Sequence, residues 1–492
     1  MTERSESDRE ADVSVGDMGP EHFRRHAHEV ADWMADYLAT VGDLPVFPDL
    51  EPGAIRDLLP EEPPDEGEPM DRVLADFRDV VVPGLTHWNH PRFFGYFAIT
   101  ASGPGILGEM LTAALNVNAM VWRSSPAATE LEELTTDWLR QLLGLPPEFD
   151  GVINDTASSS TLYALAAARD VAWPDAHERG LFGCAPGRVY ASDQAHSSVE
   201  KAVLTLGLGR SGFGAIRSDG EFRMDPDALA EAIRGDIEAG VRPVAIVATL
   251  GTTSSASMDP VAEIVQVASE FGVWLHVDAA YGGAAAIVPE LAPLFDGWRG
   301  ADSIVVNPHK WLFTPIDCSV LYCRRPADLV GAFSIVPEYL KSSEQASARS
   351  LMDYGVSLGR RFRALKLWFV LRHFGRGGLV AAIREHVRLA RVLAGWVEQA
   401  DDRALVAPVH LATIAVRFGP GWAPDAEDRA NRRIIERVNR SGEAFLTHTV
   451  LAGRTVIRVS IGNLKTTHAD VARVWASLRR AADIVRAEGE TP

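Results

Sequence analysis

The sequence predicts an α/β protein in which helices flank a mainly parallel sheet, with a helical arm before the sheet and a small α+β domain after it. The main observation is that short apolar runs alternate with amphipathic segments between about residues 93 and 374. Such alternation is typical of a parallel sheet covered on both faces. Length is the second observation, because 492 residues, 47% of them hydrophobic, can bury a substantial core and should form more than one domain.

The predicted sheet takes its strands from apolar runs and its covering helices from amphipathic segments. Strands are expected at residues 187–191, 244–250, 273–277, 303–306 and 319–323, and helices at 197–206, 226–239 and 260–271. A further run at 151–153 is a strand candidate, followed by a helical run at 162–169. We assign residues 93–375 to this large domain.

A helical segment is predicted before the sheet. Apolar side chains recur at roughly helical spacing over 22–38, and a Pro-rich stretch at 44–69 leads to a second helix that ends near residue 82. These apolar faces fit packing on another subunit and packing on their own domain equally well. We assign residues 19–92 to this segment. Residues 1–18 are polar, charged and aperiodic, which predicts a disordered tail.

The C-terminal part, residues 376–492, is predicted to form the small domain. A helix at 362–374 leads into it. Helices are then expected at 379–400, 426–440 and 468–486, and strands at 412–418 and 455–461. Elements grouped in this way favour an α+β arrangement.

Composition limits the classes of partner. Lys and Arg total 48 against 67 Asp and Glu, a net charge of −19, which argues against nucleic acid or an anionic membrane as the main partner. Cys184, Cys318 and Cys323 lack metal-ligand spacing, and so few thiols fit a reducing compartment. The N-terminus has no apolar signal region, and no run is long enough to span a bilayer. We expect a soluble cytoplasmic protein without a metal site.

Two polar residues follow neighbouring strands of the predicted sheet. Lys310 stands where the run 303–306 gives way to a loop, and Asp278 ends the run 273–277. Singly, such a lysine is usually solvated, and such an aspartate is most often a turn former or a helix cap. Together they fit pyridoxal 5'-phosphate (PLP), which needs a lysine for its Schiff-base link and a carboxylate that keeps its pyridine nitrogen protonated.

Three further stretches at strand ends have two interpretations each. The Ser/Thr cluster at 155–161 precedes a helix, and it fits either a phosphate cradle of backbone N–H groups or an ordinary helix cap. His196 follows the strand at 187–191, where an imidazole either stacks on a flat cofactor or packs at a helix cap. Thr249 either contacts the cofactor or begins a turn.

Nine segments of the chain carry a family resemblance. They are residues 23–25, 82–88, 125–132, 193–198, 248–253, 276–281, 307–311, 317–319 and 358–363. In this order, over residues 20–485, they make the chain resemble the group II PLP-dependent amino-acid decarboxylases, and within that family the aromatic-L-amino-acid decarboxylases.

The resemblance implies the aspartate-aminotransferase fold (fold type I) and a homodimer with active sites at the subunit interface, the N-terminal helices embracing the partner. It makes Lys310 the Schiff-base lysine and Asp278 the partner of the pyridine nitrogen. His196 would stack on one face of the ring, and Ala280 would pack against the other. The other implied cofactor contacts are Ala157, Ser158, Thr249, Asn307 and His309.

The resemblance also bears on the type of reaction. Residues 334–354 are polar, Ser-rich and poorly periodic, as a mobile loop would be. They contain Tyr339, which the resemblance makes the proton donor that completes a simple decarboxylation. Phenylalanine at this position in relatives goes with oxidative formation of an aldehyde. Tyr339 therefore favours the amine as product, and the aldehyde-forming reaction is the alternative.

The resemblance places a small-molecule amino acid in a pocket formed by Tyr96, Thr100, Met120 and Ile316. An aromatic substrate, namely tryptophan, tyrosine, phenylalanine or dihydroxyphenylalanine, is expected. Ile316 stands where the animal enzymes carry phenylalanine, so glutamate, 2,4-diaminobutyrate and histidine remain alternatives. An aminotransferase, or a protein of this fold that binds PLP without turnover, is a further alternative.

Overall fold

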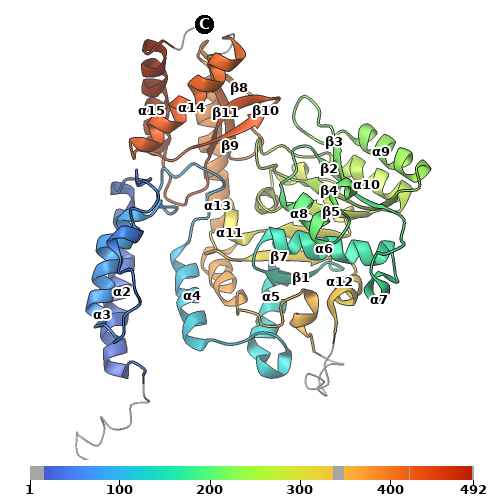
Figure 1. The fold of residues 1–492 in the computed structure, drawn as a ribbon, viewed down its shortest axis with the longest axis horizontal. Helices are drawn as coiled ribbons and strands as arrows, with labels where there is room; N and C mark the ends of the chain where they lie inside the picture. Colours follow the sequence, from blue (N-terminus) through green and yellow to red (C-terminus); the bar gives the residue numbers. More distant parts are fainter. Residues whose placement is uncertain (1–15, 336–347, 420–421, 490–492) are drawn as a thin grey trace, which may run out of the picture.

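A seven-stranded sheet forms the middle of the large domain, on the right in Figure 1. The computed structural model describes residues 16–335, 348–419 and 422–489. The strands lie in the order β1 (Asp150–Asn154), β7 (Ser319–Cys323), β6 (Ser303–Val306), β5 (Trp274–Asp278), β4 (Arg242–Thr249), β2 (Gly187–Ser192) and β3 (Phe213–Ile216). The five strands from β6 to β3 are parallel, whereas β7 and β1 run antiparallel to their neighbours. The predicted mainly parallel sheet is confirmed.

Helices cover both faces of this sheet. Successive side chains of each strand point to opposite faces, so the strands contribute to two apolar cores. On β4, Ile246 and Ala248 belong to one apolar core, while Ala245 and Val247 belong to another. The second core includes side chains of three helices, α6 (Ala157–Ala172), α8 (Ser198–Thr205) and α12 (Pro326–Phe333). The first core includes side chains of α5 (Pro126–Leu142), α9 (Pro226–Glu238) and α10 (Val261–Phe271). A short helix, α7 (Ala176–Arg179), follows α6.

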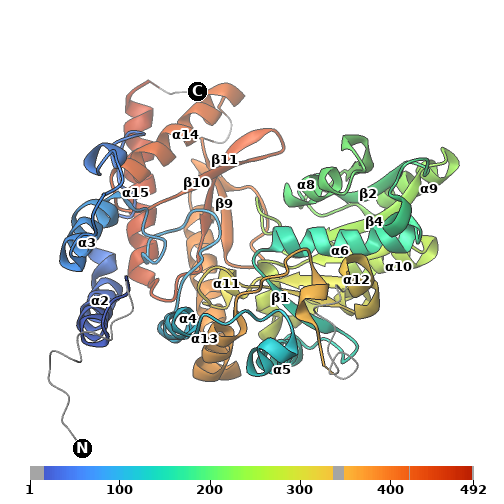
Figure 2. The same ribbon diagram turned by 60° about the horizontal axis from the view of Figure 1, so that its bottom comes forward.

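The N-terminal arm lies on the outer flank of the molecule, away from the sheet (Figure 2). It contains α2 (Pro20–Thr40) and α3 (Met70–Asp76), and α4 (Gly103–Leu115) follows it. Trp33 of α2 packs edge-on against Phe77, with 4.8 Å between the ring centroids. Phe77 directly follows α3, and Asp71 of α3 lies 3.8 Å from Arg25 and 3.6 Å from His26 of α2, so the two helices lie against each other. Phe23 nevertheless remains 62% exposed and Val73 44% exposed.

The C-terminal part is an antiparallel sheet of four strands with helices packed on it. Its strand order is β10 (Thr447–Leu451), β11 (Arg454–Ser460), β9 (Thr413–Phe418) and β8 (Arg403–Leu405). The helices are α13 (Ala364–Glu398), α14 (Pro424–Arg440) and α15 (His468–Ala487). Two predicted helices join in α13, which is interrupted at Gly375 with φ 57°. Glycine adopts this left-handed conformation without strain. The limits assigned to the domains remain predictions.

The prediction of a mobile loop over 334–354 is wrong at the C-terminal end of that segment. Leu351–Tyr354 form a 3₁₀ turn in which all four residues are buried. The turn is held because the Tyr354 hydroxyl donates to Asp150 Oδ2 at 3.1 Å and the Met352 N–H donates to Met120 O at 3.0 Å. Residues 336–347, with Tyr339, lie outside the described residues.

A search of the described helices for a membrane span found none that is both long and apolar enough.

Candidate active site

The parallel strands bring the predicted site residues to one edge of the sheet. Thr249 at the end of β4 pairs in register with Asp278 at the end of β5, and Asp278 pairs with Val305 of β6. A cavity of about 210 Å³ opens at these strand ends. The predicted cofactor contacts all line it: Ala157, Ser158, His196, Thr249, Asp278, Ala280, Asn307, His309 and Lys310.

Lys310 lies in a single helical turn, α11 (Pro308–Trp311), and not in a loop as predicted. Pro308 favours this turn because its fixed φ suits the first position of a helix. Burial lowers the pKa of Lys310; the carboxylate of Asp278 opposes this shift, and the charge of Arg458 adds to it. A lowered pKa enlarges the fraction of neutral amine, which is the nucleophilic form.

The turn is anchored through Trp311, the residue after Lys310. The Trp311 ring stacks on Tyr281 with 4.7 Å between centroids, and Tyr281 stacks on Phe97 at 3.8 Å. Trp311 Nε1 donates to His386 Nδ1 at 3.0 Å. Nζ of Lys310 lies 5.2 Å from the centroid of the Phe97 ring, so this aromatic stack forms one wall beside the lysine.

Asp278 and His196 are oriented by neighbouring backbone groups. Asp278 is 7% exposed, and its Oδ1 accepts the Ala280 N–H at 3.0 Å. Nδ1 of His196 accepts the Ser198 N–H at 3.2 Å, so the neutral ring carries its proton on Nε2. Burial lowers the pKa of His196, Asp278 opposes the shift, and Lys310 adds to it. The lowered pKa favours the neutral form of the His196 ring.

The N-terminus of α6 lies at the cavity. This helix of 16 residues begins after Thr156, whose side chain makes no capping hydrogen bond, and Ala157 and Ser158 line the cavity in its first turn. The first turn of α6 therefore borders the cavity, where its N–H groups and the helix dipole would stabilise an anion. This arrangement favours the phosphate interpretation of the Ser/Thr cluster over the ordinary helix cap.

Two polar atoms of residues that line the cavity lack hydrogen-bond partners in the described part of the chain, which also fits a cofactor site. Thr249 Oγ1 and Asn307 Oδ1 are buried, and neither has a hydrogen-bond partner among the described residues. Buried polar atoms normally have partners, so such atoms facing a cavity indicate a polar ligand. His309 is neutral because burial lowers its pKa to about 3, and its Nδ1 accepts the Cys318 N–H at 2.9 Å.

Several residues of the site were missed by the sequence reasoning. Phe97 and Tyr281 line the cavity, and Arg458 lies behind Phe97 with its guanidinium 4.4 Å from the ring centroid. Arg458 is 3% exposed, and burial lowers its pKa to about 10. The available signal was an arginine inside an otherwise apolar strand run.

The predicted substrate residues lie outside the lining of this cavity in the described part of the chain. Tyr96 and Ile316 are 54% and 57% exposed. Thr100 is buried and its hydroxyl donates to Gly462 O at 3.4 Å, while Met120 contacts the turn at Met352. Their role in binding substrate stays a prediction, as does that of Tyr339.

Two other features of the described residues are candidate binding sites. A larger hollow of about 590 Å³ lies between α14 and α15, but it is lined mainly by surface arginine and glutamate side chains. Among the described residues, His26, Glu29 and Asp71 could hold a metal ion. Arg78 lies 2.6 Å from Glu29 and Arg25 lies 3.8 Å from Asp71, so their carboxylate charges are already paired.

Comparison with known proteins agrees with this geometry. The model of the pyridoxal-dependent decarboxylase conserved domain matches residues 52–418. Tyrosine decarboxylase 1 of Narcissus pseudonarcissus is 38% identical over 95% of this chain and 94% of its own. Phenylacetaldehyde synthase of Arabidopsis thaliana is 39% identical over 94% of this chain and 96% of its own. A crystal structure of Oryza sativa TDC with PLP and tryptamine matches with TM-score 0.93 and 37% identity, covering 96% of this chain and 99% of that chain.

A match over most of the domain, together with a cavity that places Lys310 beside Asp278, identifies both cofactor and reaction class. The cofactor is pyridoxal 5'-phosphate, and the chain belongs to the pyridoxal-dependent amino-acid decarboxylases.

Proposed function

We propose that this enzyme removes carbon dioxide from an aromatic L-amino acid and releases the corresponding amine. The observation that carries the proposal is the convergence of Lys310, Asp278 and His196 on one cavity walled by Phe97 and Tyr281. The aromatic preference is supported by relatives named tyrosine decarboxylase and by a structural relative that contains tryptamine.

Asp278, Lys310, His196 and the first turn of α6 would each have a distinct task in this reaction. When bound, PLP supplies an electron-accepting ring for the bond that breaks between the α-carbon and the carboxylate. Asp278 would keep the proton on the ring nitrogen, and Lys310 would hold the cofactor. His196 would pack against the cofactor ring. The first turn of α6 would hold the phosphate.

The substrate proposal is tested by measuring carbon dioxide and amine release from PLP-loaded protein across the common amino acids. Amine from an aromatic amino acid, without hydrogen peroxide, is the expected result. Amine from glutamate, histidine or 2,4-diaminobutyrate would overturn the aromatic assignment and keep the decarboxylase mechanism. A requirement for a keto-acid acceptor would instead indicate an aminotransferase.

Tyr339 supports the amine as product over the aldehyde formed by the phenylacetaldehyde synthases among the relatives. The Tyr339→Phe variant is expected to shift most of the product from amine to aldehyde, because its side chain has no hydroxyl proton to donate to the α-carbon. The aldehyde route consumes oxygen and water and releases carbon dioxide, ammonia and hydrogen peroxide. Oxygen uptake and peroxide release, measured beside the amine, follow the change.

A matched control is Tyr190→Phe, which removes a hydroxyl that donates to Asp236 at 2.8 Å outside the cavity. This control should keep the amine as sole product. An unchanged amine-to-aldehyde ratio in Tyr339→Phe would remove Tyr339 from the proton-donor role.

The homodimer and a cytoplasmic location belong to the same proposal. Leu107, Leu111 and Leu115 stand at intervals of four on α4 and are 56%, 47% and 58% exposed, and Phe23 of the arm is exposed as well. A helix face of this kind is usually covered by another surface. Sedimentation equilibrium should give twice the 53.4 kDa mass of one chain, and a single-chain mass would refute the dimer.

Free Cys318 and Cys323, both buried, are compatible with the reducing cytoplasm.

A further inference from the structure

The outer edge of β1 is bonded to side chains instead of to another strand. This strand ends the sheet and has only β7 as a neighbour. In an antiparallel pair, alternate residues direct both N–H and C=O away from the partner strand. At Ile153 the N–H donates to Glu132 Oε1 at 2.9 Å, and the C=O accepts from Arg360 Nη2 at 2.7 Å.

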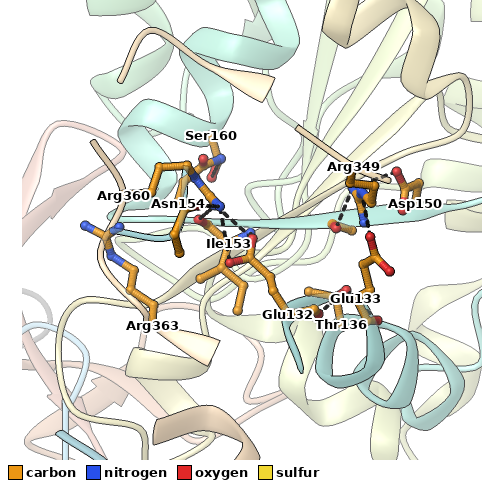
Figure 3. Close-up of polar contacts among 12 residues, drawn as sticks. Glu132, Glu133, Thr136, Asp150, Ile153, Asn154, Ser160, Arg349, Arg360 and Arg363 are labelled. Carbon is orange, nitrogen blue, oxygen red and sulfur yellow. Dashed lines mark hydrogen bonds and ion pairs between the residues drawn. The ribbon is translucent and has the colours of Figure 1, made fainter. Parts of the chain in front are cut away.

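Glu132 and Arg360 form an ion pair of their own at this edge (Figure 3). Arg360 Nη2 lies 2.8 Å from Glu132 Oε1, and the two side chains are 6% and 1% exposed. The residues belong to segments 125–132 and 358–363, which carry the family resemblance but have no part in the chemistry described above. Removing a charged pair from water costs desolvation free energy. A pair as buried as this one therefore depends on good geometry and on additional hydrogen bonds to offset that cost.

The same edge is held a second time, two residues earlier. Arg349 Nη2 donates to Gly151 O at 3.2 Å and to Asp150 Oδ2 at 2.8 Å. Figure 3 shows Arg349 and Arg360 at two places along β1. Side chains thus make the hydrogen bonds that a neighbouring strand would make.

The held edge leads directly to the phosphate cradle. Asn154 ends β1, and its Nδ2 donates at 3.1 Å to Ser160 Oγ in α6, which lies 2.9 Å from Ser319 Oγ of β7. Only Asp155 separates Asn154 from the turn at residues 156–158 that lines the cavity. A displacement of Ile153 would therefore shift the first turn of α6, which borders the cavity.

Arg360 also holds the segment that contains Met120. Its backbone N–H donates to Asn118 Oδ1 at 2.9 Å, and its C=O accepts the Ala119 N–H at 2.9 Å. One side chain and its own backbone therefore connect β1 with the segment at 118–120.

We propose that Glu132 and Arg360 are a positioning pair for the cofactor phosphate: they fix the free edge of β1 and thereby the turn at residues 156–158. Neither residue lines the cavity, so their effect on PLP passes through the backbone of Ile153. The inference concerns the cofactor site alone and does not depend on which amino acid is the substrate.

The test compares the binding of PLP with that of pyridoxal, which has the same ring and aldehyde but no phosphate. In Arg360→Lys, the affinity for PLP should fall roughly 10- to 100-fold, as is typical when a residue that orients a ligand-binding group is changed. The affinity for pyridoxal should stay within about twofold. In the apo protein, hydrogen exchange should accelerate at the Ile153 amide and over residues 155–158.

Glu132→Gln is the second variant, to be used if Arg360→Lys does not fold. Its amide oxygen still accepts the Ile153 N–H, so its loss of PLP affinity should be smaller than that of Glu132→Ala. Arg92→Lys is the matched control, because Arg92 is also buried, lies 3.2 Å from Asp470, and donates to the carbonyls of Gly42 and Glu443 away from the cavity.

Arg92→Lys should leave both affinities and exchange at residues 153–158 unchanged, even where it lowers the melting temperature as much as Arg360→Lys does. Unchanged PLP affinity in Arg360→Lys and Glu132→Ala would overturn the proposal. Equal losses for PLP and pyridoxal would also overturn it, because a general loss of packing does not distinguish a ligand with a phosphate from one without. A decarboxylation assay that fails for every amino acid would refute the proposed function and leave this result standing.

Discussion

The Lys310→Ala variant is expected to lose turnover by at least roughly 1,000-fold, because the amine that holds the cofactor and exchanges with the substrate is gone. The visible absorbance that depends on the lysine link should vanish with it. The chain has only five lysines, and Lys310 lines the cavity with its pKa lowered by burial. No other group in that lining combines a primary amine with the neighbouring carboxylate of Asp278.

The measurement is steady-state amine release together with the absorbance spectrum of the PLP-loaded protein. Lys465→Ala removes an exposed lysine and should match the parent enzyme in both readings. Reduction with borohydride should attach the cofactor to the peptide that contains Lys310. Continued steady turnover in Lys310→Ala would show that another residue performs this role.

Replacing Asp278 with alanine is expected to give the second-largest loss. Removing one partner of a buried charged pair costs about 3–5 kcal/mol, which corresponds to roughly 10²- to 10⁴-fold in rate. Asp278→Asn keeps an oxygen that can accept the Ala280 N–H, but it has no charge to hold a proton on the ring nitrogen. We expect Asn to recover cofactor binding in part and turnover very little.

The assay for Asp278 separates PLP affinity from kcat. Asp302→Asn is the matched control, since Asp302 Oδ2 accepts the Leu275 N–H at 2.8 Å at the other end of β5, away from the cavity. The control should keep kcat within about twofold, as surface-side substitutions usually do. A kcat for Asp278→Asn close to that of the parent would remove the charge from the mechanism.

The sequence predicted the parts of the fold that depend on local pattern. Continuous apolar runs marked β5 and β6. Asp278 at the end of β5 and Lys310, shortly after β6, came together because parallel strands share one edge. The reversed direction of β7, which is antiparallel to both of its neighbours β6 and β1, was not predicted, because a buried strand carries the same apolar pattern in either direction.

Contacts between distant segments were beyond reach of pattern alone. Phe97 stacks on Tyr281 across 184 positions of the chain, and no spacing rule relates the two (281 − 97 = 184). The burial of Leu351–Tyr354 depends on Asp150, about 200 positions away, so a polar, aperiodic segment was taken for a loop. Glu132 and Arg360 are charged residues in segments without chemistry, and only the free edge of β1 shows what they bond.

The stack of Phe97, Tyr281 and Trp311 has a consequence for fluorescence measurements on the enzyme. Trp311 adjoins the lysine that holds the cofactor, and its indole is fixed between Tyr281 and His386. Energy transfer from an excited indole to a chromophore in the cavity is efficient at so short a range. The fluorescence of Trp311 should therefore be quenched when PLP binds in the cavity. Tryptophan fluorescence would then report cofactor occupancy without substrate or turnover.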